Sequence, residues 1–311
     1  MHGNQINSIT VIGSINMDLV GTTNQLPRAG ETLSGTSFKM TPGGKGANQA
    51  VGLSRLGANV DLIGKIGDDI FGKELISNLK KNEVNVTNIQ ASSTTESGVA
   101  LILLDINKEN YILVIPGANA TCDKVQIEAA AKALLNSKCL LMQFEIPPHI
   151  SFKTAGVARS LGITTILDPS PCINFDYSDL ESVDIITPNQ HEAEFYTGIR
   201  VIDKESASKA AKVLKNKGVP TVIITLGSEG AFYSTVNSSG LINGNKINVV
   251  DTVGAGDAFN AGLAVAISKE STLEEAIKYA VACGNLAVTK SGAQNAMPYK
   301  NDVSYFINNT L

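Results

Sequence analysis

The segment DTVGAGDAFNAG, residues 251–262, places a carboxylate directly after a glycine-rich turn. The turn leads into a predicted helix, so backbone N–H groups at its first turn are free to hold an anion. The helix dipole adds positive potential at the same end. Asp257 stands at this helix start, where a carboxylate is either a helix cap or a general base. As a base, it would take the proton of a hydroxyl while the N–H groups hold a transferring phosphoryl group.

Two segments near the N-terminus also combine glycine with polar side chains. TPGGKGANQA, residues 41–50, has glycines that permit close backbone approach, and Lys45 and Asn48 supply donors at a helix start. In GSINMD, residues 13–18, Asn16 and Asp18 follow the first predicted strand and are spaced by two, which allows both side chains to point to the same side. Donors and acceptors in this mixture suit a compact polyhydroxylated ligand. The alternative is a glycine-rich loop shaped by packing alone.

Three further polar segments follow predicted strands. MQFEIP, residues 142–147, contains Glu145, and TPNQHEAE occupies residues 187–194. TLGSEGA, residues 225–231, is small and glycine-rich, which suits the phosphates or ribose of a nucleotide. Each segment alone is a weak signal.

Strand-like and helix-like stretches alternate along the chain, which predicts an α/β fold with a mostly parallel sheet and helices on both faces. The strand-like stretches are 9–13, 60–64, 139–144, 164–168, 183–187 and 221–227, and the helix-like ones are 45–57, 71–83, 124–136, 149–161, 205–218, 255–268 and 273–289. Since ligands of such sheets bind at the carboxyl ends of the strands, we expect the polar segments to meet there.

Two segments interrupt this alternation within the single domain expected over 1–311. Residues 15–40 lack a helix pattern, and residues 97–115 read as two strands joined by a polar turn at 107–110. Together they predict a small antiparallel sheet outside the main one. It is either a lid over the strand ends or a structural hairpin at the sheet edge.

Composition excludes several classes of protein. The net charge is −4 without a long basic run, so neither nucleic acid nor an anionic membrane surface is an expected partner. No apolar stretch approaches about 20 residues, and the N-terminus lacks a signal pattern, so we expect a soluble cytoplasmic protein. The 4 cysteines form no C-x-x-C pair and are expected to be reduced. The 3 scattered histidines, His2, His149 and His191, do not predict a zinc site.

The sequence matches two known nucleotide-binding motifs only in part. GDDIFGKE, residues 67–74, has the glycine and lysine spacing of a P-loop, but Glu74 stands where Ser or Thr would bind magnesium. The first strand is followed by SINMD rather than by the further glycines of a dinucleotide fingerprint.

The motifs taken together are more specific. The order G-S-I-N-x-D, G-G-K-G-A-N-Q-A, N-x-x-E and D-T-x-G-A-G-D resembles the PfkB carbohydrate kinase family, and within it the ribokinases, over nearly the whole chain. The resemblance implies a ribokinase-like three-layer α/β/α sandwich with a small β lid that often serves as a dimer clasp. It also implies phosphorylation of D-ribose at O5 by ATP, giving ribose 5-phosphate and ADP.

The resemblance further implies roles for particular residues. Asp257 matches the catalytic base, and the N–H groups of Gly254, Ala255 and Gly256 match the anion hole. The positions that match sugar-binding residues are Asn16, Asp18, Gly44, Lys45, Asn48 and Glu145. Those that match residues near ATP are Asn189, Thr225, Gly227, Ser228, Gly230, Gly256 and Val281. Glu192 matches a residue linked to Mg²⁺, usually through water.

A monovalent cation, commonly K⁺, is also implied beside the anion hole. The matching positions are Asp251, Val253, Ala287, Lys290, Gly292 and Ala296, most of which would contribute backbone carbonyl oxygens. Ala296 departs from the hydroxyl residue that is common in ribokinases, so the resemblance does not define the ligand at this position.

Other functions remain open at this point. A kinase of the same family could act on 2-deoxyribose, a hexose or a nucleoside such as adenosine. A sugar- or nucleotide-binding regulator without catalysis and an NAD-dependent oxidoreductase are the alternatives from other classes. The intact Asp257 and G-A-G turn favour a kinase.

Overall fold

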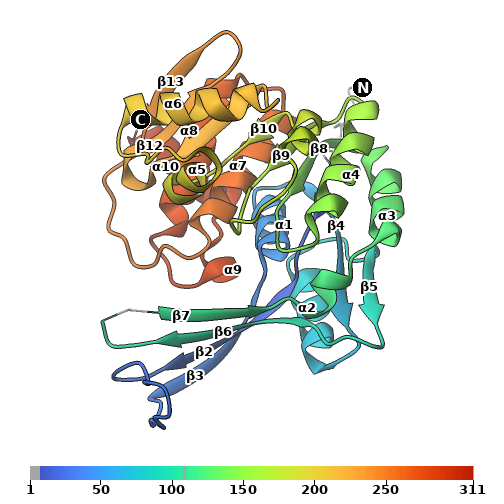
Figure 1. Ribbon diagram of the computed structural model, residues 1–311, viewed down its shortest axis with the longest axis vertical. Helices are drawn as coiled ribbons and strands as arrows, with labels where there is room; N and C mark the ends of the chain where they lie inside the picture. The colour runs from blue at the N-terminus through green and yellow to red at the C-terminus, as the bar shows by residue number, and fades with distance from the viewer. Residues whose placement is uncertain (1–7, 108–109, 311) are drawn as a thin grey trace.

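A computed structural model describes residues 8–107 and 110–310 of the chain. In this part, nine strands form a main sheet in the order β13-β12-β11-β10-β9-β8-β1-β4-β5 (Figure 1). Their bounds are β1 Ser8–Ile12, β4 Asn59–Gly67, β5 Ile89–Ser92, β8 Ser137–Met142, β9 Thr164–Leu167, β10 Ile185–Ile186, β11 Thr221–Thr225, β12 Gly230–Ser234 and β13 Ser239–Asn243. The strands from β11 to β5 pair in parallel, and β12 and β13 extend the sheet antiparallel at one edge.

Helices cover both faces of this sheet. Their bounds are α1 Lys45–Arg55, α2 Ile70–Lys81, α3 Lys124–Leu134, α4 Pro148–Ser160, α5 Gln190–Thr197, α6 Lys204–Asn216, α7 Ala255–Ser268, α8 Leu273–Ala287, α9 Ala293–Ala296 and α10 Lys300–Thr310. Alternate strand residues enter two separate cores: Cys139 and Leu141 of β8 pack with α1, α2, α7, α8 and α10, whereas Leu140 and Met142 pack with α3 to α6. The predicted α/β sandwich is therefore confirmed.

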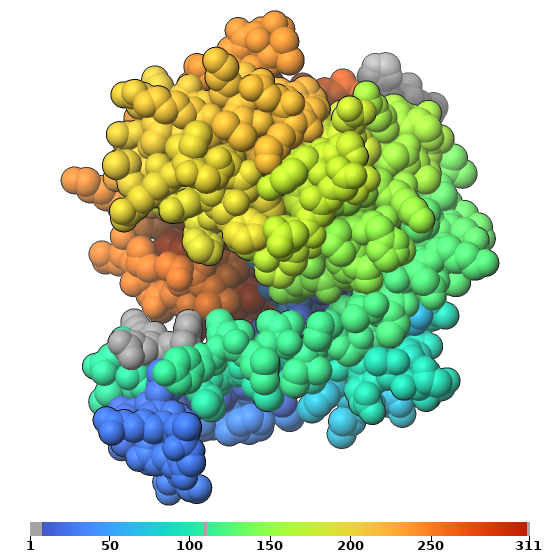
Figure 2. Space-filling model, viewed as in Figure 1, coloured from blue at the N-terminus to red at the C-terminus, as the bar shows by residue number. Residues whose placement is uncertain are grey.

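A separate four-stranded sheet has the order β3-β2-β6-β7. It consists of β2 Asn16–Thr22, β3 Ser37–Gly43, β6 Gly98–Leu104 and β7 Asn110–Ile115. Figure 1 shows it beside the main sheet, and in the space-filling view its blue and teal segments lie below the yellow, green and orange main body (Figure 2). The expectation of an antiparallel sheet is wrong at its centre, because β2 and β6 pair in parallel. Only a hairpin connection enforces antiparallel pairing, and β2 and β6 are far apart in sequence.

Most predicted elements are present with shifted ends. The helix predicted at 45–57 ends at Arg55, and the strand predicted at 183–187 is reduced to Ile185–Ile186. The elements β5, β12, β13, α5, α9 and α10 were not predicted. His2, residues 108–109 of the predicted turn and the two ends of the predicted domain lie outside the described residues. No helix within the described ranges is both long and apolar enough to cross a membrane.

Candidate active site

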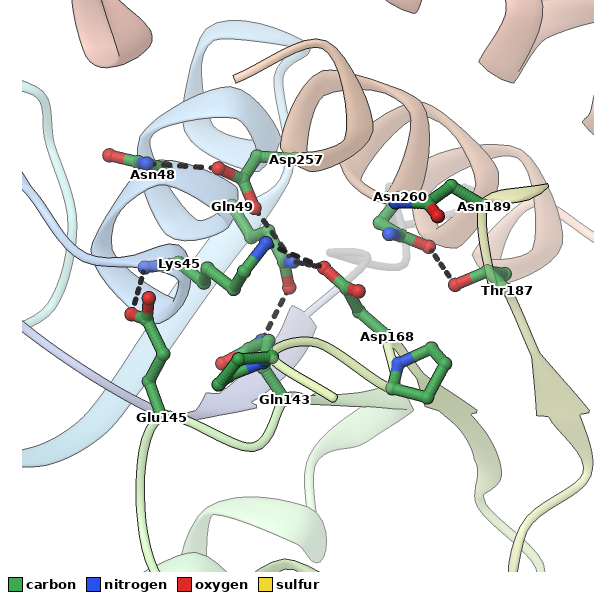
Figure 3. A network of polar contacts seen from close by, with 12 residues as sticks. Lys45, Asn48, Gln49, Gln143, Glu145, Asp168, Thr187, Asn189, Asp257 and Asn260 are labelled. Carbon is green, nitrogen blue, oxygen red and sulfur yellow. Dashed lines mark hydrogen bonds and ion pairs between the residues drawn. The ribbon is translucent and has the colours of Figure 1, made fainter. Parts of the chain in front are cut away.

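Asp257 lies in the first turn of α7, which begins after Gly254 in the left-handed conformation with φ 77°. Its side chain does not cap this helix. Instead, Oδ2 accepts a hydrogen bond of 2.9 Å from Asn48 Nδ2, and Oδ1 accepts one of 3.0 Å from Gln49 Nε2 (Figure 3). The cap interpretation is thus wrong for Asp257, because α1 rather than the backbone of α7 supplies the donors. Asp257 as a whole is 5% exposed.

The N-terminal turn of α7 offers backbone donors beside Asp257. Among the described residues, the N–H groups of Gly254 and Gly256 have no protein acceptor. The N–H of Ala255 turns back to the carbonyl of Thr252 at 3.3 Å. Two of the three expected anion-hole donors are therefore free, and the third makes a long bond within the turn.

Glu145 accepts hydrogen bonds from both polar segments near the N-terminus. Its Oε2 accepts hydrogen bonds from Ser14 Oγ at 2.5 Å, from the backbone N–H of Lys45 at 3.0 Å and from Asn16 Nδ2 at 3.5 Å. Asn119 Nδ2 in turn donates to Asn16 Oδ1 at 2.7 Å. Asn16 and Asp18 lie at the start of β2, within the segment 15–40 that was predicted to belong to the second sheet.

The glycines of the segment 41–50 are explained by close approach, as the sequence predicted. A Cβ at Gly43 would lie 2.3 Å from Asp18 Oδ2. One at Gly44, where φ is 87°, would lie 2.7 Å from the backbone nitrogen of Asn16. The chain before α1 is thus pressed against β2, and this contact brings Lys45 and Asn48 next to Asn16 and Asp18.

Asn16, Asp18, Lys45, Asn48 and Glu145 form a polar cluster. Carboxylates outnumber positive charges in and around it. Burial, followed by the charges of Glu145 and Asp257, raises the pKa of Asp18 to about 7. Burial also raises the pKa of Asp257, although Lys45 and the amides that bond its carboxylate act in the opposite direction. The site is therefore suited to ligands that bring hydrogen-bond donors or positive charge.

Lys45 is the cation that offsets these carboxylates. Burial acts against its charge, but the neighbouring carboxylates, first that of Asp168, outweigh burial and raise its pKa. Its Nζ lies 3.7 Å from Asp168 Oδ2. Lys45 is thus held in its charged form within the cluster.

A cavity of about 600 Å³ lies on the other side of the α7 turn. Its lining includes the expected nucleotide positions Thr225, Gly227, Ser228, Gly230, Gly256 and Val281. Asn189 is not part of that lining. Because Gly256 borders the cavity and Asp257 faces the polar side chains of α1, the first turn of α7 separates the cavity from these side chains.

The N-x-x-E motif forms a capping box at the start of α5. Asn189 Oδ1 accepts from the backbone N–H of Glu192 at 2.9 Å, and Glu192 Oε2 accepts from that of Asn189 at 2.8 Å. The buried Glu192 carboxylate also acts electrostatically on Lys45 and Asp168. Its link to magnesium stays a prediction, and no group of three or more potential metal-ligating side chains occurs in the part of the chain described.

The expected monovalent cation positions lie on the loop before α7 and on the segment from the end of α8 to α9. Asp251 Oδ1 accepts from the N–H of Val253 at 3.0 Å, and Oδ2 accepts from that of Gly292 at 2.9 Å. The carbonyl of Ala287 accepts from the N–H of Lys290 at 3.2 Å. Ala296 lies in the short helix α9, which follows Gly292. Asp251 therefore links the two segments that contain the expected cation positions.

Comparison with known proteins identifies the family. The model of the pfkB family carbohydrate kinases matches residues 6–300. The chain belongs to this family.

Two curated relatives of this pfkB family member have different named substrates. A ribokinase of Haemophilus influenzae is 38% identical over 300 residues, which cover 96% of this chain and 98% of the relative. A deoxyribokinase of Salmonella typhi is 36% identical over 291 residues, which cover 93% and 95%. A solved ribokinase of Arabidopsis thaliana, complexed with ribose and ATP, aligns with a TM-score of 0.92 at 29% identity and covers 97% of this chain and 98% of its own.

Sequence reasoning missed several polar residues of this family member's site. Gln49, Gln143 and Asp168 are all buried within hydrogen-bonding distance of one another or of Asp257 (Figure 3). A signal for two of them existed: Gln49 stands in the same glycine-rich segment as Lys45, and Asp168 is the last residue of the strand predicted at 164–168. Asn119 had no such signal, because it lies after the hairpin of the second sheet.

Proposed function

We propose that this chain transfers the γ-phosphoryl group of ATP to the O5 hydroxyl of D-ribose, producing ribose 5-phosphate and ADP. The observation that carries the proposal is the position of Asp257, between a polar cluster and a large cavity that meet at one glycine turn. The ribokinase relatives support the choice of sugar. The proposal includes a cytoplasmic location, where ATP is available.

The polar cluster is the proposed sugar site. Asp18 and Glu145 accept hydrogen bonds from sugar hydroxyls, whereas Asn16, Lys45 and Asn48 donate them. Binding of this kind holds one hydroxyl against Asp257, which takes its proton as the oxygen attacks the phosphorus. The raised pKa of Asp257 makes its carboxylate a stronger base than an exposed aspartate.

The cavity is the proposed nucleotide site. Thr225, Gly227, Ser228, Gly230 and Val281 line it, and Asn189 is proposed to contact the nucleotide from the start of α5. The N–H groups of Gly254, Ala255 and Gly256 then face the phosphoryl group in transfer. For Ala255, the hydrogen bond from its N–H to the carbonyl of Thr252 must break before this N–H can bind the phosphate.

Two cations complete the proposal. Glu192, through water, is the residue proposed to hold Mg²⁺, and its carboxylate fits because it already belongs to the electrostatic cluster of Lys45 and Asp168. Mg²⁺ would neutralise phosphate charge. The loops joined by Asp251 fit K⁺, since a carboxylate and backbone carbonyls are oxygen ligands. The proposed positions are Asp251, Val253, Ala287, Lys290, Gly292 and Ala296.

A second candidate substrate is 2-deoxyribose. The deoxyribokinase relative is 36% identical, almost as similar as the ribokinase at 38%. The two sugars differ by one hydroxyl, which a single side chain of the cluster is able to distinguish.

We also propose a homodimer through the second sheet, which then acts as lid and clasp together. Residues paired across neighbouring strands share a face. Asp18 pairs with Thr41, whereas its neighbour Leu19 pairs with Met40 and Leu101, and Leu101 pairs with Leu113. The face opposite Asp18 therefore carries large apolar side chains that are exposed: Phe38, Met40, Leu101, Leu103, Tyr111 and Leu113. A patch of this kind is typical of an interface.

The dimer has its own test. Leu113→Glu places a charge in the apolar face, and we expect it to shift the particle mass in light scattering from dimer to monomer. Ile202→Glu is the control, because Ile202 is also exposed, at 70%, but lies before α6. A monomeric wild-type protein would contradict the proposal.

The function is tested by ADP release with ATP and Mg²⁺. D-ribose, 2-deoxyribose, fructose and adenosine are compared, each with and without K⁺, and the position of the new phosphate ester is identified by NMR. We expect the highest turnover with ribose, increased by K⁺. A preference for deoxyribose would select the second candidate, and turnover with none of the four would contradict a sugar kinase.

Asp257→Asn tests the mechanism. The amide of asparagine cannot accept the proton, so nearly all turnover should be lost. Ribose should still bind, which calorimetry measures. Near-normal turnover of this variant would overturn the assignment of Asp257.

A further inference from the structure

A single amide group lies between two buried carboxylates of the site. Gln49 Nε2 donates one hydrogen bond of 3.0 Å to Asp257 Oδ1 and another of 3.0 Å to Asp168 Oδ2 (Figure 3). An amide nitrogen has two hydrogens, so both are used. The position of one carboxylate is thereby tied to that of the other.

Gln143 determines which way this amide faces. Its Nε2 donates to Gln49 Oε1, so the oxygen of Gln49 points toward Gln143 and the nitrogen toward the two carboxylates. Gln143 follows β8 directly, and its backbone carbonyl accepts from Ser151 Oγ at 3.0 Å. If the Gln49 amide were reversed, its oxygen would face two carboxylates, which repel it.

The rest of the Asp257 carboxylate is held from the same helix. Asn48, the neighbour of Gln49 in α1, donates to Oδ2 at 2.9 Å. Both oxygens of Asp257 are therefore fixed by consecutive residues of α1, although Asp257 itself belongs to α7. Because all of these side chains are buried, water does not replace a lost donor easily.

We propose that Gln49 is a positioning residue that aims the carboxylate of Asp257 at the sugar hydroxyl, and that Gln143 keeps the Gln49 amide in the orientation this requires. The proposal rests on the proposed role of Asp257 as proton acceptor. It assigns no contact with substrate to either glutamine.

The arrangement has an electrostatic consequence. The donors on Asp257 favour its ionised form against burial. The charged groups that face it are Lys45 on α1, Glu145 after β8, Asp168 after β9 and Asp18 on β2. Since most of these are carboxylates, loss of the Gln49 donor leaves Asp257 harder to ionise.

The first test is Gln49→Met, a change of similar volume that removes the amide. We expect kcat to fall about 10- to 100-fold, because the carboxylate loses its orientation. The sugar KM should change much less, and the acid limb of the kcat/KM profile should move to higher pH. Gln126→Met is the matched control, since Gln126 is equally buried and has both ends of its amide bonded, in the capping box of α3.

A second pair of variants tests the orientation of the Gln49 amide while leaving the Gln49 and Asp257 side chains themselves unchanged. Gln143→Met removes the donor to Gln49, whereas Gln143→Glu, once ionised, places an acceptor against the Gln49 oxygen and forces the amide to turn. At pH values on the plateau of each profile, we expect Gln143→Glu to lose more kcat than Gln143→Met. This pair keeps the test valid if Gln49→Met fails to fold.

The outcomes separate the two proposals. If Gln49→Met has the kcat and acid limb of Gln126→Met while Asp257→Asn is inactive, the positioning role is overturned and the base assignment stands. Equal kcat values for Gln143→Glu and Gln143→Met overturn the orientation role. Should Asp257→Asn retain turnover, the proposed function itself fails.

Discussion

Replacing Gly44 with alanine tests whether the contact between the start of α1 and β2 builds the sugar site. Gly44 precedes α1 with φ 87°, and an added Cβ would lie 2.7 Å from the backbone nitrogen of Asn16 and 3.0 Å from Ile15 Cα and the Ser14 carbonyl oxygen. These are backbone atoms, which cannot turn aside as a flexible side chain does. The variant must therefore displace either α1 or the first residues of β2.

Gly57 provides a matched control beyond the other end of the same helix. Its φ of 88° is almost the same, but an added Cβ would meet only Lys300 Cδ at 3.6 Å, an ordinary contact. Gly57→Ala therefore carries only the conformational cost of a left-handed alanine, about 1–2 kcal/mol. At Gly44, ψ is 130°, outside the left-handed helical region, so an alanine there is more strained than at Gly57, and the close contacts add about 1–3 kcal/mol.

The two variants are compared by thermal unfolding and by the KM for ribose. For 311 residues, 1 kcal/mol corresponds to a Tm change of about 1.5 °C, so the close contacts alone should make Gly44→Ala melt about 1.5–4.5 °C below Gly57→Ala. Its KM for ribose should rise about tenfold, because a displacement of Asn16 that costs about 1.4 kcal/mol of binding has this effect. Gly57→Ala should keep the wild-type KM. Equal Tm and KM values for the two variants would refute the reasoning.

Two further predictions concern charge and loop position. Because the pKa of Asp18 is raised to about 7 from 3.8, the folded state holds a proton that the unfolded state has lost, and stability falls as pH rises between these values. Asp18→Asn should therefore raise Tm most above pH 7, and this gain should disappear as pH falls toward 4. The variant should also bind ribose more weakly. A gain in Tm that is independent of pH in parallel melting curves would contradict this prediction. Arg55 Nη1 donates to the carbonyls of Gln294 at 2.6 Å and Met297 at 3.0 Å, which holds the segment around α9. Arg55→Lys cannot reproduce this geometry and should raise the K⁺ concentration for half-maximal activity severalfold in a KCl titration; an unchanged requirement would separate Arg55 from the cation loop.

The sequence predicted the layered fold because its signals are local. Alternating apolar stretches identified most strands of the main sheet, and each predicted helix has a matching helix in the structure. The parallel pairing of β2 with β6 was not predictable in this way. It depends on which edges two distant segments present to each other, and neither segment records that choice in its own pattern.

The residues of the candidate site also divide into those that the sequence predicted and those that it did not. Asp257, Lys45 and Asn48 stand in segments where glycine marks a close approach, so their importance was visible in the sequence. For Asn189 and Glu192 the sequence predicted a role in the site but not their local structure. The motif N-x-x-E is also typical of a capping box, and the two residues form one in the structure. A motif that satisfies a local rule gives no sign of a second role.

The buried amides were hidden for a different reason. A glutamine is ordinary in a helix, and only the folded protein brings Gln49 between Asp257 and Asp168. A buried carboxylate pair without a shared donor would repel and move apart, so the three groups make sense only together. This dependence implies that the substitutions tolerated at Gln49 are set by Asp168 and Gln143, which can be measured as non-additive effects in double-mutant cycles. Additive losses in Gln49→Met combined with Gln143→Met would mean that the two amides act independently.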